Sequence, residues 1–287
     1  MNFQKNLIHH QDCIEAIAGL PDQSVDLVLA DPPYNLGKGN AWKWDNSAPL
    51  PGMGGNWNKA MEAWDDMPLF DYFKFTLLWL SQVKRVTKPT GSMWICGTYH
   101  NIGIINFTLQ LLEIEIVNEV VWFKRNSFPN LSGRRLTASH ETLLWAHSGK
   151  KRKYHFDYEK SKRITAPWDM LKMDGKQMRT VWDIPNNKAR EELSHGRHPT
   201  QKPVRLFSRI IDICGKPQGL MLAPFAGSGT ECVAAWRAGM SYIGFETDPA
   251  FVNMANQRLD AEKNGLNLPL PADATETEDH EDRAIDV

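Results

Sequence analysis

The stretch from Val25 to Tyr34 reads VDLVLADPPY, an apolar run that ends in an acid, two prolines and a tyrosine. The run Val25–Ala30 is short and rich in Val and Leu, which is typical of a strand covered on both faces in a parallel α/β sheet. A short strand at 6–10 and a helical segment at 13–19 precede it, so the chain opens with a strand–helix–strand unit. Because open α/β sheets bind ligands at the carboxyl ends of their strands, the residues after Ala30 form the first candidate site.

The rest of the chain repeats this alternation on either side of a long irregular segment. We expect helices at 70–86, 101–113, 203–214, 230–238 and 249–263. We expect strands at 92–97, 114–124, 220–223 and 241–246, with a turn at 88–91 before the first of them. Such units predict a doubly wound α/β sheet built from residues 1–123 and 198–264. Residues 35–64 lack periodicity and are rich in Gly, Asn and Trp, which predicts a mobile loop over the site.

The formal net charge of −1 hides two segments of opposite charge. Residues 124–205 hold 19 Lys or Arg against 8 Asp or Glu, a balance of +11. Residues 271–287 hold seven acids and one arginine, so we expect 265–287 to be a disordered acidic tail. The basic stretch favours a phosphate-contacting surface, because affinity for duplex DNA rests largely on displaced counterions. The alternative is a solvated face on a loop-rich region.

The distribution of the cysteines and the hydropathy of the chain indicate the cellular compartment in which the protein works. The four cysteines are scattered without a C-x-x-C pair, which argues against a disulfide framework and a zinc site, so we expect no metal. The N-terminal residues lack the apolar core of a signal peptide, and no apolar run approaches the roughly 20 residues that span a bilayer. These features predict a cytoplasmic protein without membrane contact.

A glycine-rich turn, FAGSGT at 225–230, lies between a predicted strand and a predicted helix. Glycines there let the backbone approach a ligand, and the helix N-terminus offers unpaired N–H groups. Glu246 ends the next strand, where an acid can accept both hydroxyls of a ribose. No Lys-Ser/Thr pair follows, so the turn is not a Walker loop. We favour a nucleoside cofactor over a tight turn without a ligand.

The DPPY turn at 31–34 offers groups that suit an aromatic amine. The N6 nitrogen of adenine is a poor nucleophile, because its lone pair is delocalised into the ring. Acceptors for its two hydrogens would let it become pyramidal, and Asp31 and the carbonyl of Pro32, held rigid by Pro33, are such acceptors. Tyr34 offers a face on which a flipped base can stack. The alternative is a proline-stiffened turn with a stacking tyrosine.

Three motifs stand in a fixed order along the chain: DPPY, then HPTQKP at 198–203, then FAGSGT. In this order the chain resembles the β-group DNA amino-methyltransferases. The stretches GTYHNI at 97–102, PNLSGRR at 129–135 and HETLLW at 140–145 are similar to the adenine methylases of the HinfI and cell-cycle-regulated GANTC group. The stretch DGKQM at 174–178 is similar to the DpnA type. The likeness covers roughly residues 5–262.

The resemblance implies a Rossmann-like methyltransferase domain that transfers the methyl group of S-adenosylmethionine to N6 of a flipped adenine. The catalytic residues would be Asp31, Pro32, Pro33 and Tyr34. The cofactor residues would be Asp12, Thr200, Lys202, Pro203, Phe225, Gly227, Ser228, Gly229, Thr230 and Glu246. The insert 124–197 corresponds to the target-recognition region. The expected DNA contacts are Lys124, Arg125, Arg134, Arg135 and, in the loop, Trp44.

One departure from the family pattern leaves alternatives open. The family usually has Asp where this chain has Ala223, so a catalytically weak or inactive DNA-binding relative is one alternative. Methylation of cytosine N4 is another, although those enzymes usually carry Ser in place of Asp31. Enzymes that methylate RNA or protein usually carry Asn there, which disfavours them. The expected partners are duplex DNA or single strands, a second copy of the chain, and a cognate restriction endonuclease.

Overall fold

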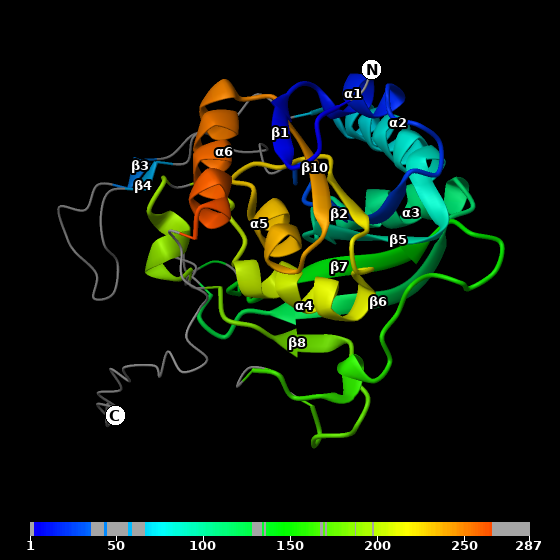
Figure 1. The fold of residues 1–287 in the computed structure, drawn as a ribbon, viewed down its shortest axis with the longest axis vertical. Coiled ribbons are helices and arrows are strands. Elements are labelled where there is room, and N and C mark those ends of the chain that lie inside the picture. Colours follow the sequence, from blue (N-terminus) through cyan, green and yellow to red (C-terminus); the bar gives the residue numbers. More distant parts are fainter. Residues whose placement is uncertain are drawn as a thin grey trace.

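The computed structural model describes residues 3–35, 67–127, 136–166, 171–186, 188–196 and 198–265, together with Arg134, Asp169 and the backbone of residues 43–44 and 57–58. Within these residues one eight-stranded sheet has the order β1-β10-β9-β2-β5-β7-β6-β8 (Figure 1). Its strands are β1 Leu7–His10, β2 Val25–Ala30, β5 Thr87–Gly97, β6 Glu115–Phe123, β7 His140–His147, β8 Val181–Asp183, β9 Leu220–Ala223 and β10 Ser241–Glu246. The helices are α1 Cys13–Ala18, α2 Leu69–Val86, α3 Ile102–Leu111, α4 Val204–Cys214, α5 Thr230–Arg237 and α6 Pro249–Lys263, with 3-10 turns η2 Lys160–Lys162 and η3 Arg190–Leu193.

Helices cover both faces of the sheet, as the apolar strands predicted. Helices α4, α5 and α6 pack on one face, and α1, α2 and α3 pack on the other (Figure 1). Successive residues of a strand point to opposite faces, so in β5 Trp94 and Cys96 enter the first core while Met93 and Ile95 enter the second. The doubly wound α/β prediction is confirmed.

Strand β7 differs from the prediction that the segment 124–197 is irregular. It lies inside the sheet, antiparallel to both β5 and β6, with Trp145 opposite Trp94. Its run of six buried residues ending at His147 packs into both cores, which explains why it occupies a central position. The prediction of irregular structure is therefore wrong for His140–His147, and the sheet is mixed.

The turn expected at 88–91 lies within β5 as an irregularity of the strand. Thr87 pairs with Val25 and Ser92 pairs with Leu27, so four residues of β5 stand opposite Asp26 alone. Lys88 bonds the Asp26 carboxylate at 2.7 Å and stabilises this excursion. A Cβ on Gly91 would lie 2.7 Å from the Asp26 carbonyl oxygen, so the close approach requires glycine.

The loop predicted at 35–64 lies outside the described residues, apart from Asn35 and the backbones of β3 Lys43–Trp44 and β4 Trp57–Asn58, which pair antiparallel. Asn35 connects its two ends: the side chain accepts from the Met67 amide at 2.7 Å and donates to the Met67 carbonyl at 3.0 Å. The tail expected at 265–287 is described only at its first residue. Among the described helices, none is both long and apolar enough to span a membrane.

Candidate functional site

A cavity of about 270 Å³ lies where the parallel strands β1, β2, β9 and β10 end. Residues at the ends of these strands line it, namely 11–13, 31–34, 224–228 and 245–247, together with Met67, Phe75, His198, Thr200, Gln201, Lys202, Thr230, Glu231 and Phe251. The two predicted turns, DPPY and FAGSGT, therefore meet in one space, because β2 and β9 are neighbours in the sheet. This is the edge at which open α/β sheets bind ligands.

Glu246 is held at one end of the cavity by three backbone amides. Its carboxylate accepts from Gly227 at 2.9 Å and from the next two residues, Thr247 at 2.8 Å and Asp248 at 2.9 Å. Gly227 has a φ of 45°, and a Cβ there would contact the His198 ring at 3.4 Å. The turn therefore needs glycine to run this close to the cavity.

His198 is a cavity residue that the residue-by-residue prediction missed, although its motif was recognised. Its ring meets Phe251 edge-on, with the ring centroids 4.4 Å apart. Burial lowers the pKa of His198 to about 4, against the smaller opposing effect of Glu246. The imidazole is thus neutral at pH 7, and it forms part of the wall opposite the glycine-rich turn.

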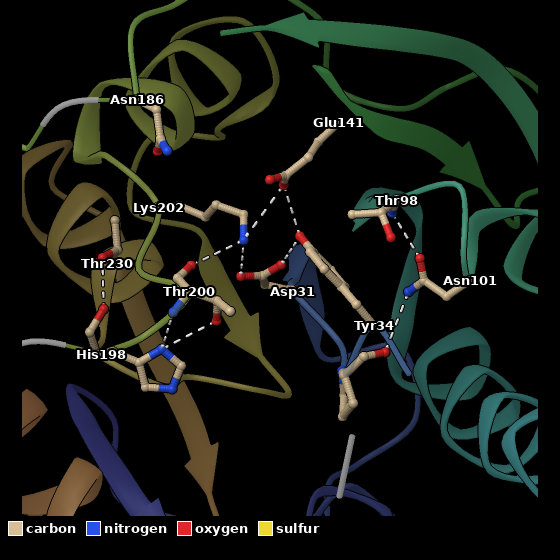
Figure 2. Close-up of polar contacts among 12 residues, drawn as sticks. Asp31, Tyr34, Thr98, Asn101, Glu141, Asn186, His198, Thr200, Lys202 and Thr230 are labelled. Carbon is tan, nitrogen blue, oxygen red and sulfur yellow. Dashed lines mark hydrogen bonds and ion pairs between the residues drawn. The ribbon is translucent and has the colours of Figure 1, made fainter. Parts of the chain in front are cut away.

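Asp31 lies at the other end of the cavity, with both carboxylate oxygens bonded. Tyr34 donates its hydroxyl hydrogen to one oxygen at 2.6 Å, and Lys202 bonds the other at 2.8 Å. In Figure 2 these two side chains approach Asp31 from different sides. Burial raises the pKa of Asp31, and the Lys202 ammonium opposes that rise. The arrangement fixes the direction in which the carboxylate can accept further hydrogen bonds.

The backbone carbonyls of the two prolines in the DPPY turn differ in the hydrogen bonds that they accept. The Pro33 carbonyl accepts from Tyr72 at 2.7 Å and from Asn101 at 3.4 Å, which anchors the turn to α2 and to the start of α3. Among the described residues, no donor bonds the carbonyl of Pro32, which lines the cavity. This carbonyl is therefore free to accept a hydrogen from a ligand, and its role toward a target amine stays a prediction.

Lys202 was expected to contact the cofactor, but it also pairs with two acids. Its ammonium lies 2.8 Å from Asp31 and 3.7 Å from Glu141, and its side chain is only 4% exposed. The same ammonium lies over the Tyr34 ring, 4.8 Å from its centroid. Stacking of a base on Tyr34 stays a prediction, since Lys202 already contacts the ring.

Glu141, at the start of β7, completes this buried cluster. It lies 3.0 Å from the Tyr34 hydroxyl oxygen, whose single hydrogen is shared with Asp31, and it bonds Lys124 at 2.8 Å (Figure 2 shows the contact with Tyr34). Although burial by itself raises the pKa of Glu141, the cations Lys202 and Lys124 hold it below its ordinary value. Glu141 belongs to the HETLLW stretch that carries the family resemblance, but it was not predicted as a site residue. The feature that could have indicated it is an acid at the start of an apolar strand.

The other predicted site residues divide into those at the cavity and those away from it. Phe225, Ser228, Thr230 and Thr200 line it, and Asp12 does so while also capping α1 through the Ile14 amide at 2.9 Å. Gly229 and Pro203 do not line it. Gly229 instead packs beneath the turn, where a Cβ would lie 3.0 Å from Ile8. Pro203 precedes the first residue of α4.

The predicted DNA contacts have mixed surroundings. Lys124 is 12% exposed and paired with Glu141, so it belongs to the buried cluster. Arg125 is 47% exposed and bonds both carboxylate oxygens of Asp183, at 3.0 and 2.7 Å. Arg134 is exposed, while Arg135 and the Trp44 side chain lie outside the described residues. DNA contact by these residues stays a prediction.

The basic charge of the segment 124–205 does not form one surface. Because β7 is antiparallel to β5, its first residues lie at the cavity edge and its last residue, His147, lies at the opposite edge. The exposed cations Lys150, Lys151, Arg152 and Lys153 follow His147. Arg152 bonds Glu115, the first residue of β6, at that same distant edge. The balance of +11 therefore overstates the positive charge beside the cavity.

Together, the Rossmann-like sheet and a cavity that joins a glycine-rich turn to a carboxylate–carbonyl pair define a nucleoside-cofactor methyltransferase acting on an amino group.

Comparison with known proteins agrees. Residues 25–257 match the family model described as DNA methylase, N6_N4_Mtase. The Type II methyltransferase M.HinfI of Haemophilus influenzae is 34% identical over 258 residues, which are 88% of this chain and 68% of that protein. The Type II methyltransferase M2.DpnII of Streptococcus pneumoniae is 35% identical over 264 residues, 91% and 92% of the two chains.

Solved structures show the same fold. The M1.HpyAVI–SAM complex has a TM-score of 0.62 at 25% identity, covering 88% of this chain and 98% of that one. The PvuII cytosine-N4-specific DNA methyltransferase has a TM-score of 0.65 at 17% identity, covering 90% and 91%. The chain belongs to the DNA methylase family. It is a site-specific DNA methyltransferase that uses S-adenosylmethionine as its methyl donor.

Proposed function

We propose that the chain methylates N6 of an adenine that is turned out of the DNA helix into the cavity. The observation that supports this most directly is the pair of acceptors at the end of β2. The Asp31 carboxylate is held in a fixed direction by Tyr34 and Lys202, and the Pro32 carbonyl beside it is free. Two acceptors are what the two hydrogens of an exocyclic amine require.

The residues of this chain orient the amine and receive its charge. When bound, the cofactor supplies a methyl group on a sulfonium sulfur, which would leave as a neutral thioether as the amine takes the methyl group, so no covalent intermediate on the protein is needed. Hydrogen bonds from N6 to Asp31 and Pro32 turn its lone pair away from the ring and toward the methyl carbon. As the N–C bond forms, positive charge develops on N6, and the Asp31 carboxylate stabilises it. Asp31 is also placed to accept the surplus proton.

At the other end of the cavity, Glu246 fits a ribose. Its carboxylate is oriented by backbone amides and lines the cavity, and Gly227 leaves room for a nucleoside against the wall formed by His198 and Phe251. In this proposal Glu246 would hold the ribose of S-adenosylmethionine, and the methionine end would take the part of the cavity nearer Asp31. This orientation would bring the methyl group toward the carboxylate–carbonyl pair.

Substituted DNA tests the choice of base. We expect labelled S-adenosylmethionine to methylate amplified genomic DNA but not the same DNA amplified with N6-methyl-dATP in place of dATP, since one hydrogen of every target amine is then replaced. DNA amplified with N4-methyl-dCTP is the matched control and should be methylated normally. Loss of transfer on the cytosine-substituted DNA instead would move the assignment to cytosine N4.

We also propose that two copies of the chain associate through the outer face of α2 and α3. Large apolar side chains are exposed there, among them Leu69 at 59%, Phe70 at 65% and Phe107 at 58%. Surfaces of this kind often mark sites of protein association. Sedimentation velocity should give the mass of a dimer, shifted toward the monomer by Phe70→Lys; a monomer at every concentration would rule the pairing out. A partner endonuclease and acceptance of single strands stay predictions.

A further inference from the structure

Glu231 is a buried acid at the cavity that has no role in the methyl transfer proposed above. It lies in the first turn of α5, directly after the glycine-rich turn, and is 3% exposed. It lines the cavity, and the hydrogen bond that acts on its carboxyl group comes from its own backbone amide. The other buried acids differ: Asp31, Glu141 and Glu192 each have at least two donors, Glu192 through the amides of Ala189 and Val204.

The surroundings of Glu231 favour its uncharged form. Burial is the largest cause that raises its pKa to about 8, and the nearby Asp31 carboxylate raises it further. Its own backbone amide, Lys202 and Arg258 act in the opposite direction with less effect. The thiols of Cys96 and Cys232 also face it, and both are protonated at neutral pH because burial raises their pKa values. A buried acid with so few partners is costly to ionise unless a ligand pairs with it.

A cation is the ligand that this acid fits. S-adenosylmethionine carries its positive charges, the sulfonium and the α-ammonium, at its methionine end. That end must lie close to Asp31 for the methyl group to reach the target amine. The interaction of Glu231 with Asp31 and Lys202 places it at this end of the cavity. Its position in the first turn of α5 also favours a negative charge, because of the helix dipole.

We propose that Glu231 binds the cationic methionine end of S-adenosylmethionine as a carboxylate. This inference depends on the cofactor orientation given under the proposed function. It accounts for Ala223, where the family resemblance led us to expect an acid. Ala223 is fully buried in the core and does not line the cavity, whereas Glu231, eight residues later, does. The acid at the methionine end is thus supplied by the helix and not by the strand.

Two ligands separate this role from a structural one. We expect Glu231→Gln to weaken S-adenosylmethionine binding at least tenfold in calorimetry. Methylthioadenosine keeps the nucleoside but lacks both charges, so its affinity should change less than twofold. A Gln side chain has nearly the shape of a protonated Glu side chain and is likewise uncharged, so the variant should fold like the native chain. Glu246→Gln is the matched control and should weaken both ligands.

Proton release gives a second readout that a structural role would not produce. At pH 7 a group of pKa about 8 is about nine-tenths protonated, so pairing with the cation should release close to one proton per cofactor bound. Calorimetry in two buffers of different ionisation enthalpy measures this number. The α-amino group of the cofactor also titrates near this pH, at about 7.7–8.0, but it is already mostly protonated at pH 7, so it can take up only a small fraction of a proton on binding. Glu231→Gln should therefore release almost none.

The outcomes separate the inference from the function on which it depends. If the native chain binds both ligands and Glu231→Gln binds S-adenosylmethionine equally well with the same proton release, the proposed role of Glu231 is wrong. If Glu246→Gln leaves both affinities unchanged, the cofactor orientation itself is wrong. A tenfold loss specific to the charged ligand, with proton release abolished, supports both.

Discussion

Replacing Asp31 by Asn should slow DNA methylation by about a hundredfold to a thousandfold, while S-adenosylmethionine still binds. The native carboxylate can accept from Tyr34, from Lys202 and from the target amine at once, because each oxygen has two lone pairs. An amide keeps the shape but has one acceptor oxygen, which Lys202 will attract. Its NH₂ group then faces the target amine, donor against donor, and the negative charge that stabilises the transition state is lost.

The measurement is a single-turnover rate at saturating cofactor, with the cofactor dissociation constant obtained separately. Asp26→Asn is the matched control, because Asp26 is a buried carboxylate of the same strand that bonds Lys88 at the opposite edge of the sheet. It should lower stability without lowering the rate. A rate for Asp31→Asn above one-tenth of the native rate would contradict the role given to this carboxylate.

Replacing Lys202 by Met should destabilise the chain by about 3–5 kcal/mol, because it leaves a buried carboxylate without its counterion. Lys202 is 4% exposed and contacts both Asp31 and Glu141, and Glu141 alone keeps a second cation, Lys124. Lys202 is also the main group that opposes the rise in the pKa of Asp31 caused by burial, so methylation should fall as well. Thermal unfolding should show a midpoint lower by on the order of 10 °C.

A double-mutant cycle gives the sharper test of this pairing. Adding Asp31→Asn to Lys202→Met removes the unpaired charge, so the double variant should be more stable than Lys202→Met alone. Strictly additive losses in the cycle would show that the two residues do not interact. A midpoint for Lys202→Met within 2–4 °C of the native value, about 1 kcal/mol, would show that Lys202 is not the counterion.

The elements of the fold that could be predicted are those with a local sequence pattern. The strand Val25–Ala30 and the strands and helices after residue 203 were predictable because apolar periodicity and turn residues are local features. Strand β7 was missed because its eight residues lie among basic and irregular sequence, and only pairing with β5 and β6 reveals their position. The irregularity of β5 was expected as a turn, since its Lys-Pro-Thr-Gly sequence is turn-like while its pairing with β2 is a property of the sheet.

Only the parts of the site that belong to sequence motifs could be predicted. The DPPY and FAGSGT turns meet at the cavity as expected, because both follow parallel strands that are neighbours. The contacts among distant residues were not predictable: Lys202 and Asp31 are separated by 171 positions, and Tyr34 and Glu141 by 107. Nor does the sequence show how few partners Glu231 has, since that depends on every element around the cavity.

Nucleoside mass spectrometry tests the central claim most directly. Purified protein, S-adenosylmethionine and unmethylated genomic DNA would be incubated, and the DNA digested to nucleosides, with Asp31→Asn treated in parallel. We predict N6-methyladenine from the native chain and almost none from the variant. N4-methylcytosine as the product, or N6-methyladenine formed equally by Asp31→Asn, would contradict the account.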